Sequence, residues 1–196
     1  STVTPTNIKI VDNLIEDYIY NPEFLREKHA EVDFINASMI ILGGSKDNQE
    51  KVKNLYENHS ICETTNYVLT DKVTASLIKY SINSFLASKV IFFNELRDLF
   101  NSSGAEEDWD IFTKVLAMDK RIGNSHMNVP GHDGRLGFGG ACFTKDTAAL
   151  IKYSQSLEQE LTFLKKAVEI NNKIRSKYDQ VDQRENDQNV NYEFDD

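Results

Sequence analysis

The chain has 196 residues, a hydrophobic fraction of 40% and a net charge of −9. This length allows one full core, or a partial domain joined to a smaller helical one. The acidic balance argues against sequence-independent binding to nucleic acid, which requires clustered Lys and Arg. We find neither an apolar run of membrane-spanning length nor a secretory signal pattern in residues 1–10, so we expect a cytoplasmic protein with no membrane segment.

Residues 1–70 alternate short apolar runs with polar stretches that are compatible with helices, a pattern that indicates βα units. We expect strands at Tyr18–Tyr20, Ser38–Leu42 and Cys62–Leu69. A helix is expected over Asp47–Asn58, beginning as early as Ser45.

Residues 71–101 contain neither Pro nor Gly, and their pattern predicts one long helix. Its apolar side chains cover more than one stripe, which predicts burial on most sides. Such a helix packs either between two domains or against a second copy of itself, and we expect a homodimer formed through it.

The remainder of the chain is expected to be helical around one structured loop. The expected segments are helices over Trp109–Asp119, Phe143–Ser156 and Leu157–Lys177, a glycine-rich loop over Gly123–Gly140, and an acidic tail over Asp179–Asp196. The tail has too few apolar side chains to fold alone, so it could lie on a partner surface. These segments divide the chain into residues 1–70, 71–178 and 179–196.

The two cysteines, Cys62 and Cys142, lie far apart and suggest free thiols rather than a disulfide framework. Cys142 follows Gly137-Phe138-Gly139-Gly140-Ala141 and precedes Phe143-Thr144-Lys145-Asp146. The start of the following helix favours a thiolate at Cys142, as a nucleophilic cysteine requires. A small buried hydrophobic residue beside a tight turn is an equal alternative.

Two further groups of polar residues are candidates for chemistry. Lys79 and Asn83 share one face of the long helix, where they are either donors for an oxyanion or a solvent-reaching Lys beside a satisfied Asn. Glu23 and Glu27 follow an expected strand, where carboxylates handle protons or simply belong to the surface.

Together these motifs resemble the UDP-glucose/GDP-mannose dehydrogenase family, from Ser1 to about Lys177. The matching segments are Ser1-Thr2-Val3, the Pro-Glu-Phe-Leu segment within 21–27, Lys79-x-x-x-Asn83 with Phe93-Asn94-Glu95, Asp119-Lys120-Arg121-Ile122-Gly123, and Gly137 to Asp146. In the family these segments are the end of a Rossmann strand, an active-site segment, the long central helix, the substrate loop and the catalytic cysteine motif.

The resemblance implies an α/β plus all-α fold, in which the C-terminal part of a Rossmann-like NAD-binding domain precedes the central helix and a small helical dimerisation domain. It also implies a four-electron oxidation of the C6 alcohol of a UDP-sugar or GDP-sugar, of the UDP-glucose to UDP-glucuronate type. Two NAD⁺ would accept the hydrides, and Cys142 would carry a thiohemiacetal and then a thioester.

The resemblance also assigns roles to single residues. Lys79 and Asn83 would stabilise the oxyanion, Asp146 and Thr2 would hold a water and the proton relay, and Glu23 or Glu27 would serve acid–base steps. The implied substrate-binding residues are Phe24, Leu25, Arg26, Glu27, Arg121, Gly137, Phe138, Gly139 and Gly140, with Arg121 reaching across a dimer interface. The implied cofactor-binding residues are Thr2, Glu27 and Lys145, and no metal site is expected.

Three departures from the family pattern qualify these expectations. Lys28 stands where Gly is usual, and Thr144 where many members have Pro. No Gly-x-Gly-x-x-Gly occurs in the chain, so we expect a family member truncated at both ends, inactive with NAD⁺ by itself unless another chain supplies the missing half. The alternative is a non-catalytic homologue that acts as a dimerising or sugar-nucleotide-binding module.

Overall fold

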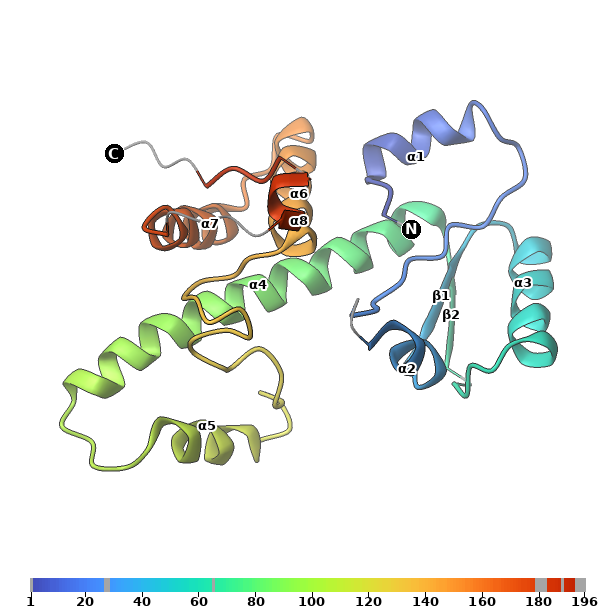
Figure 1. The fold of residues 1–196 in the computed structure, drawn as a ribbon. Helices are drawn as coiled ribbons and strands as arrows, with labels where there is room; N and C mark the ends of the chain where they lie inside the picture. Colours follow the sequence, from blue (N-terminus) through green and yellow to red (C-terminus); the bar gives the residue numbers. More distant parts are fainter. Residues whose placement is uncertain (1, 27–28, 65, 179–182, 188, 193–196) are drawn as a thin grey trace. The chain divides into compact units, whose positions relative to one another are not determined.

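The computed structural model describes residues 2–26, 29–64, 66–178, 183–187 and 189–192. Its elements are α1 (Pro5–Asp12), α2 (Ala30–Ile35), β1 (Ile40–Gly43), α3 (Lys46–His59), β2 (Tyr67–Thr70), α4 (Lys72–Ser102), α5 (Trp109–Ala117), α6 (Ala141–Ser156), α7 (Thr162–Arg175) and α8 (Gln183–Asp187). Contacts divide the chain into two compact units, residues 1–82 and residues 83–196, and α4 begins in the first and ends in the second (Figure 1). Over the described residues, no helix is long and apolar enough to cross a membrane.

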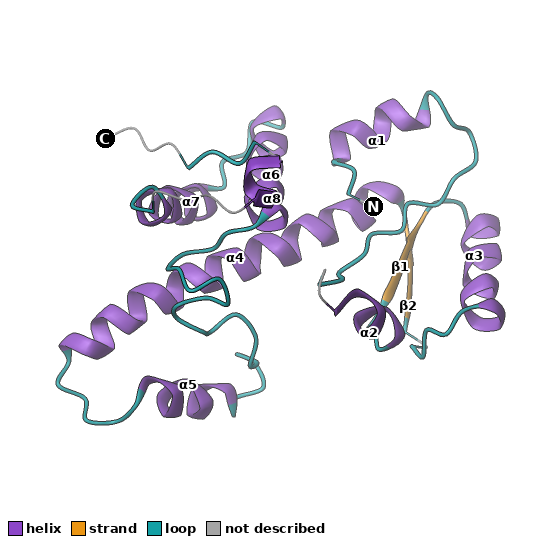
Figure 2. Cartoon of the chain, viewed as in Figure 1, coloured by secondary structure: helices purple, strands orange, loops and turns teal. Residues whose placement is uncertain are grey.

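The first unit is built on a parallel pair of strands, β1 and β2, joined by α3 (Figure 2). Ile40 of β1 lies opposite Tyr67 of β2, and every residue of β1 is buried. The helix α3 packs along both strands. A parallel pair needs such a crossover connection, so this is the βα arrangement that the sequence predicts.

All three expected strands are shorter in the structure, and the one predicted over Ser38–Leu42 is regular over Ile40–Gly43. The one predicted over Tyr18–Tyr20 is reduced to a single bridge, in which Tyr20 exchanges backbone hydrogen bonds of 2.9 and 2.8 Å with Gly43. The one predicted over Cys62–Leu69 is regular only from Tyr67, because the Glu63 amide donates instead to the carbonyl of Ile35.

Residues Pro5–Asp12 form a helix, α1, that the apolar pattern did not predict. Thr2 and Val3 lie outside any strand, and the Val3 carbonyl accepts a 2.7 Å hydrogen bond from the Ser76 hydroxyl. The Thr4 hydroxyl then accepts from the Asn7 amide, and Pro5 occupies the first turn of α1. Both features are typical helix-starting signals.

A single buried side chain, Gln49 of α3, closes the turn that follows β1. Its Nε2 atom donates to the carbonyl oxygens of Leu42, Gly44 and Thr70 at 3.0, 3.1 and 2.6 Å. These carbonyls come from the ends of both strands, so Gln49 ties α3 to the sheet.

We expect Gln49→Leu to lower the free energy of unfolding of the first unit by about 2 to 4 kcal/mol, because it removes the side-chain donor that three carbonyls at the ends of the strands share. Chemical unfolding followed by circular dichroism measures this change. Asn54→Leu, which replaces an exposed amide on the same helix, is the matched control. Equal destabilisation by the two substitutions would contradict the role given to Gln49.

The second unit consists of the C-terminal part of α4 with α5, α6, α7 and α8. Phe138 and Phe143 join Ala87 and Ile91 of α4 in one apolar cluster, and α6 packs on α7. The long helix was predicted to within one residue at each end. The final long helix was predicted to begin at Leu157 but begins at Thr162, after Glu158 has taken a positive φ of 56°.

In the single chain, part of the surface of α4 is exposed, and its burial against a second copy stays a prediction. Phe85, Phe92 and Leu99 remain 69%, 58% and 64% exposed. Their spacing of seven residues places them along one face of the helix, and we call them the α4 stripe.

Candidate active site

Cys142 is the second residue of α6, and its side chain is exposed. Gly140 precedes the helix with a φ of 78°, a conformation that favours glycine. The first turn of a helix has free backbone N–H groups and the positive end of the helix dipole. The alternative of a small buried residue is therefore wrong, and an accessible thiol stands at a helix N-terminus.

The glycine loop, residues 137–140, is held by side chains from three helices. The amide of Gly137 donates to Asn94 Oδ1 at 3.0 Å, that of Phe138 to Asn171 Oδ1 at 2.7 Å, and that of Gly140 to Glu185 Oε1 at 2.7 Å. Buried backbone donors in a loop need such partners. The loop before Cys142 is thus fixed on both its α4 and α7 sides.

Arg175 completes this support from the C-terminal end of α7. Its Nη2 atom donates to the Gly137 carbonyl at 2.9 Å, and Nη1 donates to Asp133 Oδ2 at 2.6 Å. Burial raises the pKa of Asp133. Opposing effects that are together larger leave this pKa below its ordinary value: hydrogen bonds from Arg175 and the Arg135 amide, and the nearby charges of Arg175 and His132. The carboxylate of Asp133 therefore stays ionised to a lower pH than an ordinary aspartate does.

Sequence reasoning missed Asp133, Asn171, Arg175 and Glu185 as parts of the site. One signal was readable: Asn171 and Arg175 are polar and stand one helical turn apart, as Lys79 and Asn83 do. Glu185 lies in the acidic tail, which was expected not to fold alone and to lie on a partner surface. In the structure, its side chain is only 1% exposed.

Two of the expected catalytic residues meet in the second unit. Asp146 is 1% exposed, and its carboxylate accepts hydrogen bonds from Asn83 Nδ2 at 2.5 Å and from Lys145 Nζ at 2.6 Å. The resemblance implies that Lys145 binds the cofactor, but in this structure its ammonium group forms an ion pair with Asp146. A buried carboxylate with two donors is well suited to orient a water molecule.

In the first unit, Lys79 meets the segment that begins at Glu23. Its ammonium group is buried, donates a short hydrogen bond to the Glu23 carbonyl, and lies 3.9 Å from the Glu23 carboxylate and 4.8 Å from the ring centre of Phe24. Lys79 therefore does not extend to solvent. Thr2 is half-buried in the same unit.

The remaining residues of this segment are tied to their neighbours. The Leu25 amide donates to Glu23 Oε2 at 2.8 Å. The guanidinium of Arg26 forms a bidentate ion pair with the Asp33 carboxylate. Hydrogen bonds from the Arg26 side chain and backbone lower the pKa of Asp33 to about 2. Glu27 lies outside the described residues.

Arg121 lies in the turn that follows α5. Its guanidinium is exposed and pairs with Asp119. A surface pair of this kind contributes little to stability, so Arg121 is free to bind a ligand at little cost.

The first unit does not fit the pyrophosphate of NAD in the way that a dinucleotide-binding turn would. Gly43 and Gly44 follow β1 and precede α3, but a Cβ atom at Gly43 would lie 2.8 Å from Ala75 Cβ, and one at Gly44 would lie 2.5 Å from Ile19 Cδ1. Their space is filled by the protein itself. Gln49 also closes the turn from inside, so these glycines serve packing rather than a phosphate.

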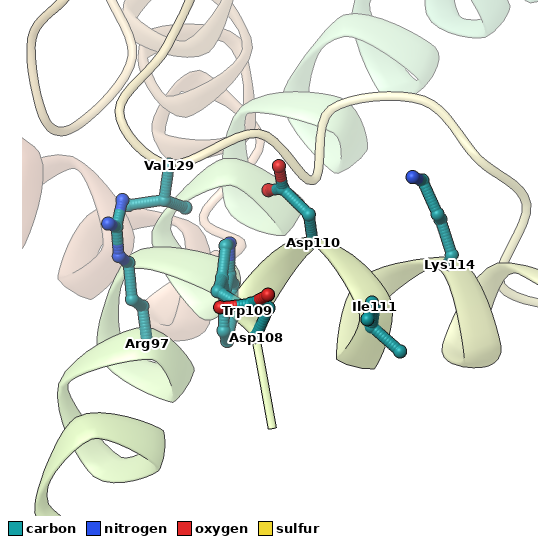
Figure 3. Close-up of a pocket in the computed structure, with 7 residues that line it drawn as sticks. All are labelled: Arg97, Asp108, Trp109, Asp110, Ile111, Lys114 and Val129. Carbon is teal, nitrogen blue, oxygen red and sulfur yellow. The ribbon is translucent and has the colours of Figure 1, made fainter. Parts of the chain in front are cut away.

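A separate open cavity of about 510 Å³ lies against α5, lined by Arg97, Asp108, Trp109, Asp110, Ile111, Lys114 and Val129 (Figure 3). Its charged side chains carry both signs, so it favours neither anions nor cations. None of the expected site residues lines it.

The fold of this chain resembles that of nucleotide-sugar dehydrogenases. The structure of a UDP-glucose dehydrogenase from Pyrobaculum islandicum superposes with a TM-score of 0.72 at 30% identity, over 87% of this chain and 39% of that protein. The UDP-glucose 6-dehydrogenase of Rickettsia bellii is 38% identical over 157 residues, which are 76% of this chain and 34% of the relative. UDP-glucose 6-dehydrogenase YwqF of Bacillus subtilis is 32% identical over 181 residues, 88% of this chain and 39% of the relative.

The chain belongs to the UDP-glucose/GDP-mannose dehydrogenase family, whose central-domain model matches residues 73–173. The resemblance read from the motifs is therefore confirmed. The matched relatives are longer proteins, of which this chain spans about a third.

Proposed function

We propose that the chain is the central part of a nucleotide-sugar 6-dehydrogenase that converts a UDP-glucose-type sugar to its C6 carboxylate, with Cys142 as the nucleophile. The observation that carries the proposal is the exposed Cys142 thiol at the N-terminus of α6, beside a glycine loop held by Asn94, Asn171 and Glu185. The names of the relatives favour UDP-glucose as substrate over a GDP-sugar.

The proposed chemistry of this chain begins with a sugar aldehyde at C6. The Cys142 thiolate adds to the carbonyl carbon and gives a thiohemiacetal, whose oxygen would accept a hydrogen bond from Asn83 and, as the resemblance implies, from Lys79. Once C6 reaches the thioester level, water attacks it, and the Asp146 carboxylate accepts a proton from that water. The products are the free carboxylate and the regenerated thiol.

The family implies NAD⁺ as the acceptor of the two hydrides. The turn at Gly43 and Gly44 does not fit its pyrophosphate, so the steps assigned to this chain are those of the thiol and of water. The substrate roles of Phe24, Leu25, Arg26, Arg121 and the glycine loop belong to the same proposal.

The proposal is tested without turnover by adding the UDP-sugar 6-aldehyde, labelled with ¹³C at C6, to the chain. A new C6 resonance that is present with wild type and lost with Cys142→Ser is the expected result. A C6 resonance that is the same with both proteins would overturn the nucleophile assignment. If the aldehyde binds without a covalent adduct, the chain acts instead as a sugar-nucleotide-binding module.

The two cysteines give an internal comparison of reactivity. Cys142 is exposed at a helix N-terminus, whereas Cys62 is half-buried in the segment between α3 and β2. We expect iodoacetamide to alkylate Cys142 at least about tenfold faster than Cys62 at pH 7, because the side chain of Cys142 is exposed and that of Cys62 is half-buried. Mass spectrometry of timed samples measures both rates, and equal rates would indicate that the motif serves packing alone.

A further inference from the structure

The carboxylate of Glu185 is bound to the glycine loop in the way that a ligand would be. Its Oε1 atom accepts from the Gly140 amide at 2.7 Å and from the Tyr192 hydroxyl at 2.6 Å, and Oε2 lies 3.6 Å from Arg135 Nη1. Tyr192 is itself buried. We call Glu185 and Tyr192 the C-terminal clasp.

The clasp fills the space that Gly139 leaves open. A Cβ atom at Gly139 would lie 2.6 Å from Glu185 Oε1 and 2.8 Å from the guanidinium of Arg175. Glycine permits this approach of a charged group to the backbone, and here the approaching group belongs to the chain itself. The Nε atom of Arg175 is buried beside it with no acceptor among the described residues.

The clasp also places a negative charge at the start of α6, where Cys142 is the second residue. A helix N-terminus attracts one anion through its free amides and dipole, and a second anion nearby is disfavoured. Glu185 therefore competes with any anion that approaches Cys142. Burial, and then the hydrogen bond to Glu185, raises the pKa of Tyr192, which keeps its hydroxyl a donor to the carboxylate.

The backbone of this segment also forms a hydrogen bond within the segment. The Val190 amide donates to the Glu185 backbone carbonyl, which closes the segment on itself rather than on the rest of the unit. Glu185 and Tyr192 are its buried side chains among the described residues after 182. Loss of either side-chain contact would therefore remove a buried attachment of this segment.

We propose that the C-terminal clasp is an internal competitor for an oxyanion site, in which the Glu185 carboxylate holds the Gly140 amide until an anionic ligand replaces it. Release of the clasp would leave Arg135, Arg175 and the Gly140 amide for a phosphate or carboxylate group beside Cys142. The proposal does not depend on catalysis, because its readouts are the reactivity and protection of one thiol.

The first test compares alkylation of Cys142 by iodoacetate, an anion, with alkylation by neutral iodoacetamide. We expect Glu185→Gln to raise the iodoacetate-to-iodoacetamide rate ratio at Cys142 by about threefold or more, since one nearby negative charge is removed. Glu169→Gln removes an exposed carboxylate of α7 and is the matched control. The same ratio in wild type, Glu185→Gln and Glu169→Gln would overturn the proposal.

The second test adds inorganic phosphate before iodoacetamide. Phosphate should protect Cys142 in Glu185→Gln at a concentration that leaves wild type unprotected, and acetate replaces phosphate in a parallel series to distinguish the two oxyanions. Equal protection of wild type and variant would mean that the clasp does not compete. Tyr192→Phe, which keeps the charge but removes the hydroxyl donor, should show partial protection, and Trp109 fluorescence confirms that each variant is folded.

Discussion

Replacing Arg175 by methionine is expected to lower the free energy of unfolding of residues 83–196 by about 3 kcal/mol, because it breaks a largely buried ion pair and leaves one partner behind. Asp133 would keep its charge without the guanidinium, and the Gly137 carbonyl would lose a donor. Methionine fills most of the space of the arginine stem, so the loss reflects the polar contacts. Urea unfolding followed by the fluorescence of Trp109, the single tryptophan, reports on this unit.

Arg121→Met is the matched control for this experiment. It removes an ion pair whose arginine is almost fully exposed, and exposed pairs contribute between about 0 and 1 kcal/mol. Similar losses at the two positions would contradict the structural role of Arg175.

The same pair predicts a dependence on pH. The lowered pKa of Asp133 adds stability that is complete above the ordinary carboxyl pKa of about 3.9 and is lost as the pH falls through the lower, folded value. The difference in stability between wild type and Arg175→Met should therefore narrow below about pH 4. A difference that widens on acidification would contradict this sign.

Introducing a charge into the α4 stripe is expected to dissociate a dimer. We propose that Phe85, Phe92 and Leu99 pack against the same helix of a second chain, since a regular row of exposed large apolar side chains is rare on a monomer. Phe92→Glu should weaken self-association by about 100-fold or more, measured by sedimentation equilibrium.

Phe163→Glu provides the control, because Phe163 is also exposed but lies on α7 rather than on α4. It should leave the association constant unchanged. A wild-type chain that remains monomeric at micromolar concentration would refute the proposed dimer.

The elements best predicted from the sequence were those with strong local signals. The absence of Pro and Gly over 71–101 placed α4 to within one residue, because nothing in that stretch ends a helix. The strand expected at Tyr18–Tyr20 became one bridge, since pairing depends on a partner that local pattern cannot show. The start of α1 was readable from Thr4 and Pro5 but was hidden by weak apolar periodicity.

The sequence predicted the reactive residues of the candidate site, but it did not predict the side chains that hold the glycine loop in place. The glycines before Cys142 marked the loop, because their conformational freedom is visible in the sequence. The side chains that hold the loop come from positions 33 to 45 residues away, and no local rule connects Asn171 or Glu185 to it. Such partners are selected by tertiary packing, and single-sequence reasoning has no access to it.

The paired glycines after β1 affect how homologous sequences should be compared. If Gly43 and Gly44 prove invariant among relatives, a reader would be tempted to infer a phosphate-binding turn from that invariance. The positions of Ala75 and Ile19 give a steric reason for the same invariance. A larger residue at position 43 should therefore occur only with a smaller residue at position 75. Positions 43 and 75 should covary among homologues whether or not a nucleotide binds nearby.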